Sequence, residues 1–307
     1  GVSVAMKFYM DQVGSTIKPF LYALAMEGDE SGSDSFTPCS MLSNTQPVIT
    51  LPDGQTWMPR NSGKARVGEM VDLRWALTNS NNWISARLIQ EVHPSELVKY
   101  MHNMGITSKL PAVPSLALGP AEISLREMVT GYSAFANQGS YSQPLYVTAI
   151  TDNSGNVLAT FRPNRTEAIG RQAYYRILSI LLNVVDSGTG NRLRRPPYSL
   201  SAQIGGKTGT TNNNSDGWFM GFTPDLVAGA WVGGDERYIH FNTMANGQGA
   251  EMALPIFGRF MRAVYDDPKL NYSQSARFEF PADINICGNY VPEAPETVEQ
   301  TVEGYFD

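Results

Sequence analysis

The change in hydrophobic periodicity near residue 200 constrains the fold of this chain more than any other feature. Between residues 71 and 185, apolar residues recur mainly at helical spacing. Short β-prone runs follow at 202–204, 218–222 and 226–232, separated by Gly, Asn, Asp and Pro, and helical spacing returns at 250–265. Helices arranged around one antiparallel meander predict an α+β fold.

Several segments carry their own boundary signals. Ser124-Leu125-Arg126-Glu127 has the spacing of a capping box and predicts a helix that ends before Gly139. Asn153-Ser154-Gly155 lies between two β-prone runs, which predicts a hairpin. Further helices are expected at 71–77, from residue 83, at 94–104 and at 171–185.

Ser15 and Lys18 lie where a helix is predicted to begin. Gly14 and Pro19 bracket this start, and an apolar run at 20–26 follows it. Residues three apart share a helix face, so the Ser15 hydroxyl and the Lys18 amine would point the same way. A serine nucleophile needs an adjacent base, and a lysine becomes one when burial or a nearby cation lowers its pKa. Taken alone, the pair is better explained as a helix cap followed by a surface lysine.

Two further polar clusters could complete such a site. Ser80-Asn81-Asn82 lies on the loop between two predicted helices, and Lys207-Thr208-Gly209-Thr210 lies at the end of a predicted strand. Each cluster also has a plain structural explanation as a turn. Lys207 would place a second cation near Lys18, and the two threonines would offer hydroxyls to a substrate carboxylate. Glycine beside them would let a ligand backbone approach the strand.

Composition and spacing exclude several classes of protein. The net charge is −6, and six acidic residues but no Lys or Arg follow residue 280, so no basic face indicates nucleic-acid binding. Gly-Lys-Thr is not a phosphate loop, because Ser201 stands where that motif requires glycine. Cys39 and Cys287 either pair or remain buried thiols, and three scattered histidines do not favour a zinc site or a His-based triad. No stretch approaches the ~20 apolar residues of a membrane span.

The three clusters occur in the order Ser-x-x-Lys, Ser-x-Asn and Lys-Thr-Gly, the motif set of penicillin-binding proteins and related β-lactamases. Residues 14–263 resemble the C-terminal transpeptidase domain of class A (bifunctional) penicillin-binding proteins. The likeness is carried by GSTIKPFLYALAME, ALTNSNNWISARLI, LALGPAEISLREMVTGYSAFANQG and GKTGTTNNNSDGWFMGFTPDLVAGAWVGGD. Ile17 departs from the family, which commonly has an aromatic residue there. The resemblance implies the penicillin-binding protein and serine β-lactamase fold, an antiparallel sheet flanked by helices with an all-helical part.

By this resemblance, Ser15 attacks the penultimate D-Ala of a peptidoglycan stem peptide. Lys18 is expected to take the hydroxyl proton, Ser80 to relay a proton towards the departing D-Ala, and Asn82 to hold the peptide amide. An amine on a neighbouring stem then takes the acyl group, and β-lactams acylate the same serine. The rest of the expected site comprises Lys207 as a catalytic residue and Thr208, Gly209 and Thr210 as substrate-binding residues, with the backbone amides of Ser15 and Thr210 as the oxyanion hole.

The resemblance implies no metal, no organic cofactor and no nucleic-acid partner. Residues 1–280 are expected to form the transpeptidase domain, and residues 281–307 an acidic C-terminal tail. The domain would work at the outer face of the bacterial cytoplasmic membrane, through an anchor and beside a glycosyltransferase domain that lie upstream of this chain. Two alternatives remain open. A serine β-lactamase or D,D-carboxypeptidase of the same fold would need a positioned base for water, and a non-catalytic β-lactam sensor would keep the fold.

Overall fold

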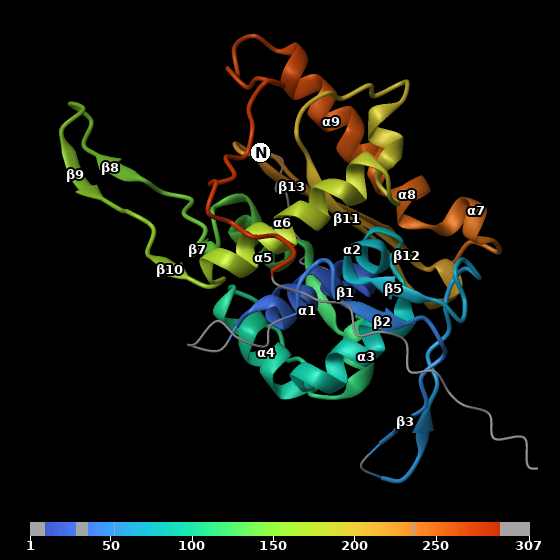
Figure 1. Ribbon diagram of the computed structural model, residues 1–307. Coiled ribbons are helices and arrows are strands. Elements are labelled where there is room, and N and C mark those ends of the chain that lie inside the picture. The colour runs from blue at the N-terminus through green and yellow to red at the C-terminus, as the bar shows by residue number, and fades with distance from the viewer. Residues whose placement is uncertain (1–9, 29–35, 52, 235, 237, 289–307) are drawn as a thin grey trace, which may run out of the picture.

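The central element of the fold is a three-stranded antiparallel sheet. The computed structural model describes residues 10–28, 36–51, 53–234, 236 and 238–288 (Figure 1). In the sheet, β12 (Asp216–Phe222) lies between β11 (Gly205–Thr210) and β13 (Val227–Gly233). The register sets Lys207 opposite Met220. Directly opposed residues project from the same face of a sheet, so these two side chains share a face.

Helices cover both faces of this sheet. Every residue of β12 is buried, and its alternate side chains enter two different cores. Met220 belongs to the main core, and Phe219 faces the other way, where its ring centroid lies 4.9 Å from that of Phe257. This layered arrangement confirms the α+β class. The flanking helices are α5 (Leu125–Ala136) and α6 (Arg171–Asp186) on the first face and α9 (Leu254–Asp266) on the second, and α1 (Lys18–Met26) packs against α6.

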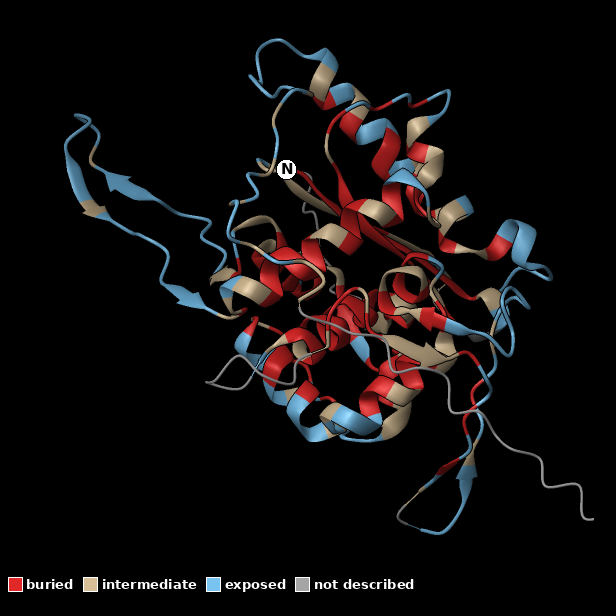
Figure 2. Ribbon diagram, in the orientation of Figure 1, coloured by how far each residue is buried: buried red, intermediate tan, exposed pale blue. Residues whose placement is uncertain are grey.

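A mostly helical part lies on the other side of α1 from the sheet (Figure 1). Its helices α3 (Asn82–Val92) and α4 (Pro94–Asn103) both contact α1, which is therefore enclosed from two directions. Every residue of α1 except Leu24 is buried, as the red central helix in Figure 2 shows. Lys18, the first residue of α1, is consequently held in the interior. The 3₁₀ helix η2 (Pro114–Leu118) belongs to the same part. The helix α2 (Leu73–Thr78) leads into α3 and contacts α6 as well as α1.

The other strands of the described residues form antiparallel pairs. The ribbon of β8 (Ala149–Thr151) and β9 (Val157–Thr160) projects from the body (Figures 1 and 2). Tyr146, just before β8, is 75% exposed, and Leu158 of β9 is 66% exposed. The pairs are β1 (Met10–Gln12) with β6 (Glu122–Ser124), β2 (Met41–Ser43) with β5 (Met70–Asp72), β3 (Ile49–Thr50) with β4 (Thr56–Trp57), β7 (Ser140–Ser142) with β10 (Arg165–Glu167), and β8 (Ala149–Thr151) with β9 (Val157–Thr160).

Two local predictions are confirmed. Ser124 and Glu127 form the reciprocal bonds of a capping box, in which Glu127 N donates to Ser124 Oγ (3.3 Å) and Ser124 N donates to Glu127 Oε2 (3.2 Å). The hairpin predicted around Asn153-Ser154-Gly155 is the β8–β9 pair, and Gly155 adopts φ +85° in its turn.

Three predicted boundaries are wrong. The helix expected at 71–77 begins at Leu73, because 70–72 pair with β2 and the Asp72 side chain caps the helix by accepting from Trp75 N (2.6 Å). The strand expected at 202–204 begins instead at Gly205. The helix expected at 250–265 is divided at Ala253 into α8 (Gly249–Met252) and α9, whose first turn contains a proline.

Cys39 and Cys287 form a disulfide with a Cα–Cα distance of 5.2 Å, which decides between the two alternatives open in the sequence. The same C-terminal segment is held on α6 by an ion pair between Arg171 and Asp283 (2.7 Å). Within the described part of the chain, no helix is long and apolar enough to cross a bilayer. The described residues also contain no group of His, Cys, Asp and Glu side chains that could hold a metal ion.

Candidate active site

Ser15 lies on η1 (Gly14–Ile17), a 3₁₀ turn that leads directly into α1. In a 3₁₀ turn, residues three apart eclipse each other, so Ser15 and Lys18 share a face as predicted. The turn begins with Gly14 at φ +53°, and Gly14 N donates to Gly119 O (2.9 Å). A Cβ at Gly14 would lie 2.8 Å from Thr210 O, and one at Gly119 would overlap Gly14 O. The turn that carries Ser15 is therefore packed backbone to backbone.

The Lys18 side chain is fully buried and reaches the Ser80–Asn82 loop. Its amine donates to Ser80 O (2.8 Å) and Asn82 Oδ1 (2.7 Å), with longer contacts to Asn81 O (3.3 Å) and Ser80 Oγ (3.4 Å). Among the described residues, this amine makes no hydrogen bond to Ser15. Lys18 thus joins the first predicted cluster to the second.

The loop that carries Ser80 and Asn82 joins α2 to α3. Ser80 adopts φ +56°, a conformation that residues with a Cβ seldom take. Asn82 is held from outside the motif, because its backbone N donates to Asn61 Oδ1 (2.7 Å) and its Nδ2 donates to Arg60 O (2.6 Å). These bonds fix Asn82 so that its Oδ1 faces the Lys18 amine.

Strand β11 brings the third cluster against the other two. The fully buried Lys207 amine donates to Ser80 Oγ (2.8 Å) and to Thr208 O (3.0 Å). The Thr208 hydroxyl shares a hydrogen bond with Thr189 Oγ1 (2.7 Å). Lys207 and its neighbours lie within the strand, and not at its end as predicted, so regular pairing with β12 sets their alternation.

Both amines are buried without a carboxylate partner. Among the described residues neither lysine forms an ion pair with Asp or Glu. Burial, together with the nearby Lys207 cation, lowers the pKa of Lys18 well below its ordinary value. Burial lowers the pKa of Lys207 to about 7. The uncharged amine, which is the form that accepts a proton, is therefore more accessible in Lys18 than in a surface lysine.

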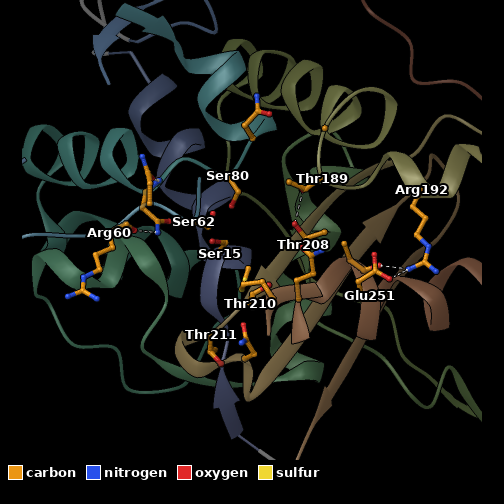
Figure 3. Close-up of a pocket in the computed structure, with 18 of the residues that line it drawn as sticks. Ser15, Arg60, Ser62, Ser80, Thr189, Arg192, Thr208, Thr210, Thr211 and Glu251 are labelled. Carbon is orange, nitrogen blue, oxygen red and sulfur yellow. Dashed lines mark hydrogen bonds and ion pairs between the residues drawn. The ribbon is translucent and has the colours of Figure 1, made fainter. Parts of the chain in front are cut away.

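Residues from all three clusters line a cleft of about 680 Å³, namely Ser15, Ser80, Asn82, Thr208 and Thr210 (Figure 3). Ser15, Ser80 and Thr210 lie together in the view, and Thr208 is joined to Thr189 across it. The charged side chains lining the cleft are Arg60 on one side and the Arg192–Glu251 ion pair on the other. A cleft of this volume is large enough to admit a peptide.

The structure gathers all three predicted clusters. Gly209 packs against the turn that carries Ser15, since a Cβ at Gly209 would lie 2.8 Å from Thr16 Cγ2. The Thr210 hydroxyl accepts from Gly249 N (3.0 Å). Sequence reasoning missed the residues that hold the motifs, namely Arg60, Asn61 and Thr189. Thr189 lies between two glycines, which was a usable signal. Nothing in the sequence marked Arg60 or Asn61.

The fold and the cleft together define an α+β domain with the Ser15 and Ser80 hydroxyls beside two buried amines. Residues 9–233 match the family model described as penicillin binding protein transpeptidase domain, and this chain belongs to that family. It is 34% identical over 264 residues to penicillin-binding protein 1A of Neisseria lactamica, covering 82% of this chain and 31% of the relative. The corresponding protein of Aquifex aeolicus is 30% identical over 294 residues, covering 95% of this chain and 38% of the relative.

Solved structures agree with these sequence relatives. The crystal structure of penicillin-binding protein 1A from Haemophilus influenzae superimposes with a TM-score of 0.74 at 27% identity, over 84% of this chain and 43% of that one. PonA1 from Mycobacterium tuberculosis, at 21% identity and a TM-score of 0.72, shares the fold over 95% of this chain and 78% of that one. The resemblance to the transpeptidase domain of class A penicillin-binding proteins is confirmed. The chain spans about a third of the length of the curated relatives it matches.

Proposed function

We propose that this chain is a peptidoglycan D,D-transpeptidase that crosslinks stem peptides through an acyl-enzyme on Ser15. The observation that carries the proposal is the buried, carboxylate-free Lys18 amine, which contacts the Ser80–Asn82 loop beside Ser15. Its lowered pKa brings the amine closer to the range in which a general base works. Family membership supports the same assignment.

Acylation begins when Ser15 Oγ attacks the carbonyl carbon of the penultimate D-Ala, and Lys18 Nζ takes the hydroxyl proton. Catalytic hydrogen bonds are often long or unformed before substrate binds, so a Ser15–Lys18 bond is expected in the complex. The backbone amides of Ser15 and Thr210 stabilise the oxyanion, each by roughly 3 kcal/mol. Collapse of the intermediate breaks the peptide bond, and the departing D-Ala nitrogen receives a proton through Ser80 Oγ.

The remaining residues bind substrate. Lys207, which contacts Ser80 Oγ, keeps the local potential positive and, with the Thr208 and Thr210 hydroxyls, attracts the carboxylate of D-Ala or of a β-lactam. Asn82 holds the peptide amide. An amine of a second stem then attacks the acyl carbon, forms the crosslink and releases Ser15. A β-lactam enters the same cycle because its strained amide acylates Ser15.

The proposed division of the chain is residues 1–280 as the transpeptidase domain and 281–307 as the acidic tail. The first tail residues are fixed to the domain by the Arg171–Asp283 ion pair and by the disulfide of Cys287. We place the domain at the outer face of the bacterial cytoplasmic membrane, where its substrate lies, with any membrane anchor upstream of this chain.

Mass spectrometry after benzylpenicillin treatment tests the proposal. We expect one added penicilloyl mass that maps to the peptide containing Ser15 and is absent from Ser15→Ala. Stem pentapeptide with an amine acceptor should yield a crosslinked product and free D-Ala. A penicilloyl adduct that survives for hours supports a transpeptidase, whereas loss within seconds indicates a β-lactamase. Hydrolysed tetrapeptide without crosslinks indicates a carboxypeptidase, and an adduct without any peptide turnover indicates a sensor.

A further inference from the structure

Asn44 lies outside the cleft yet is bonded to the loop that carries Ser80 and Asn82. It follows β2 directly, and its side chain is fully buried. Asn44 Oδ1 accepts from Asn81 Nδ2 (2.8 Å), while Asn44 Nδ2 donates to Ala65 O (3.1 Å) and Arg66 O (2.7 Å). Both ends of this buried amide are therefore hydrogen-bonded, which fixes its orientation.

Asn81 transmits that orientation to the catalytic loop. Its Oδ1 accepts from Ile84 N (3.0 Å) and so caps α3, while its Nδ2 is held by Asn44. The backbone O of Asn81 accepts from the Lys18 amine (3.3 Å) and from Ser85 Oγ (2.9 Å). Asn81, between Ser80 and Asn82, is thus held through both its side chain and its main chain.

We propose that Asn44 is a positioning residue for acylation, which acts through Asn81 to hold Ser80 and Asn82 against the two buried amines. The inference rests on the proposed function, since it concerns the same site. The contacts at stake join Lys18 Nζ to Ser80 O and Asn82 Oδ1, and Lys207 Nζ to Ser80 Oγ. Ser80 has a left-handed backbone, a conformation that persists only where its surroundings impose it.

Asn44 could also act only by holding the 65–69 segment, and variants can distinguish that role from positioning of the Ser80–Asn82 loop. Asn44 N also donates to Glu69 O (2.8 Å), and Gly68 N donates to Asn44 O (3.0 Å), so this residue also holds the 65–69 segment. Asn44→Asp separates the roles, because it keeps an oxygen for Asn81 Nδ2 but loses both donors to the 65–69 segment. Asn44→Ala loses both sets of bonds. Gln46→Ala is the matched control, since Gln46 lies two residues on and donates only to Pro59 O (3.0 Å).

The experiment measures acylation by benzylpenicillin at one fixed pH for all variants and well below the unfolding temperature. We expect Asn44→Ala to lower the first-order acylation rate constant at least tenfold and to change the dissociation constant of the precovalent complex by less than about twofold. Asn44→Asp should retain most of the rate, and Gln46→Ala all of it. Asn81→Ala should match Asn44→Ala, and the double variant should be no slower than the slower single variant.

Three results would overturn the inference. They are a folded Asn44→Ala that acylates at the wild-type rate, an Asn44→Asp as slow as Asn44→Ala, and a double variant that loses the product of the two single effects. If Asn44→Ala does not fold, Asn44→Asp and Asn81→Ala decide the question by the same criteria. Wild-type protein that does not acylate contradicts the proposed function instead. Hydrogen exchange at residues 80–84 then tests the positioning, with faster exchange expected in Asn44→Ala or Asn81→Ala and not in Gln46→Ala.

Discussion

The chemistry of individual residues depends on two buried amines that lack a carboxylate partner. An unpaired buried charge is unfavourable, so such a lysine releases its proton at lower pH than a surface lysine. The Lys207 cation further lowers the pKa of Lys18, and both amines contact Ser80 Oγ. The base that we propose is accordingly a lysine and not a histidine.

Removal of the Lys18 amine tests its assignment as the base. Lys18→Met keeps the side-chain length but cannot accept a proton, so acylation by benzylpenicillin at pH 7 should fall roughly 10²- to 10⁴-fold. Stopped-flow acylation measures the rate, and circular dichroism checks the fold. Lys99→Met, on an exposed ion pair with Glu96, is the control and should leave the rate unchanged. A Lys18→Met rate within a few-fold of wild type would remove the base assignment.

The pH dependence of acylation tests the coupling between the amines. The Lys207 cation lowers the pKa of Lys18, so its removal in Lys207→Gln should raise that pKa. As pH falls, Lys18 would then become protonated at a higher pH than in the wild type. The acid limb of the pH–rate profile should therefore move to higher pH. Acylation rates between pH 5 and pH 10 measure the midpoint. The exposed Lys269→Gln should leave it in place, and an acid limb that stays or moves to lower pH in Lys207→Gln would contradict the coupling.

The site residues were predictable from the sequence to the extent that motif spacing encodes them. Ser15 and Lys18 are three apart on one turn, so local geometry alone placed them on one face. The contact of Lys18 with Asn82 depends on packing of α1 against α3, which only the resemblance to a family could supply. Asn61 was not predictable, because its role is a single bond to a backbone amide 21 residues away.

Among the elements, α5 depends on its N-terminal cap. Burial opposes ionisation of Glu127, but hydrogen bonds from Ser124, Ser108 and Thr107 outweigh it and lower the pKa to about 2. A carboxylate with a lowered folded-state pKa stabilises the fold above its unfolded pKa of about 4.3, and this contribution is lost as pH falls towards 2. In the folded protein the ionised cap therefore links the 107–108 segment to α5 down to about pH 2.

Glu127→Gln should lower the free energy of unfolding at pH 7 by about 3 kcal/mol, the equivalent of a shift of two pKa units. The difference from wild type should shrink steadily between pH 4.3 and pH 2, because the wild-type carboxylate becomes protonated there. Urea denaturation at pH 7 and pH 3 measures both values, with the exposed Glu96→Gln as the control. An equal difference at the two pH values would show that ionisation of Glu127 does not stabilise the cap.

Element types were easier to predict than element ends. The capping box and the apolar stripe of α5 are local signals, and both proved correct. The start of β11 was misplaced because Gly205 and Gly206 have low strand propensity, yet pairing with Phe222 and Gly221 draws them into the sheet. The start of α2 was misplaced because Met70 and Val71 pair with β2, a contact distant in sequence.

At the scale of the whole molecule, the disulfide joins residues 248 positions apart. Closing so long a loop restricts the unfolded chain, so Cys39→Ser with Cys287→Ser should lower the free energy of unfolding by about 2–5 kcal/mol. Denaturant midpoints with and without dithiothreitol measure this, and the double variant should be insensitive to the reductant. Penicillin acylation of the folded double variant should remain normal, because neither cysteine lines the cleft. A variant as stable as the oxidised wild type would show that the crosslink adds nothing.

The backbone packing around Gly14 and Gly119 has a consequence for attempts to engineer this domain. Main-chain atoms of Thr210, Gly14 and Gly119 meet without an intervening side chain. The position of the Ser15 hydroxyl therefore depends on the absence of a Cβ at Gly14 and at Gly119. Random libraries that vary other residues of the cleft can therefore leave Ser15 in place, whereas a methyl group at either glycine displaces it. Screens for altered antibiotic preference should hold positions 14 and 119 constant.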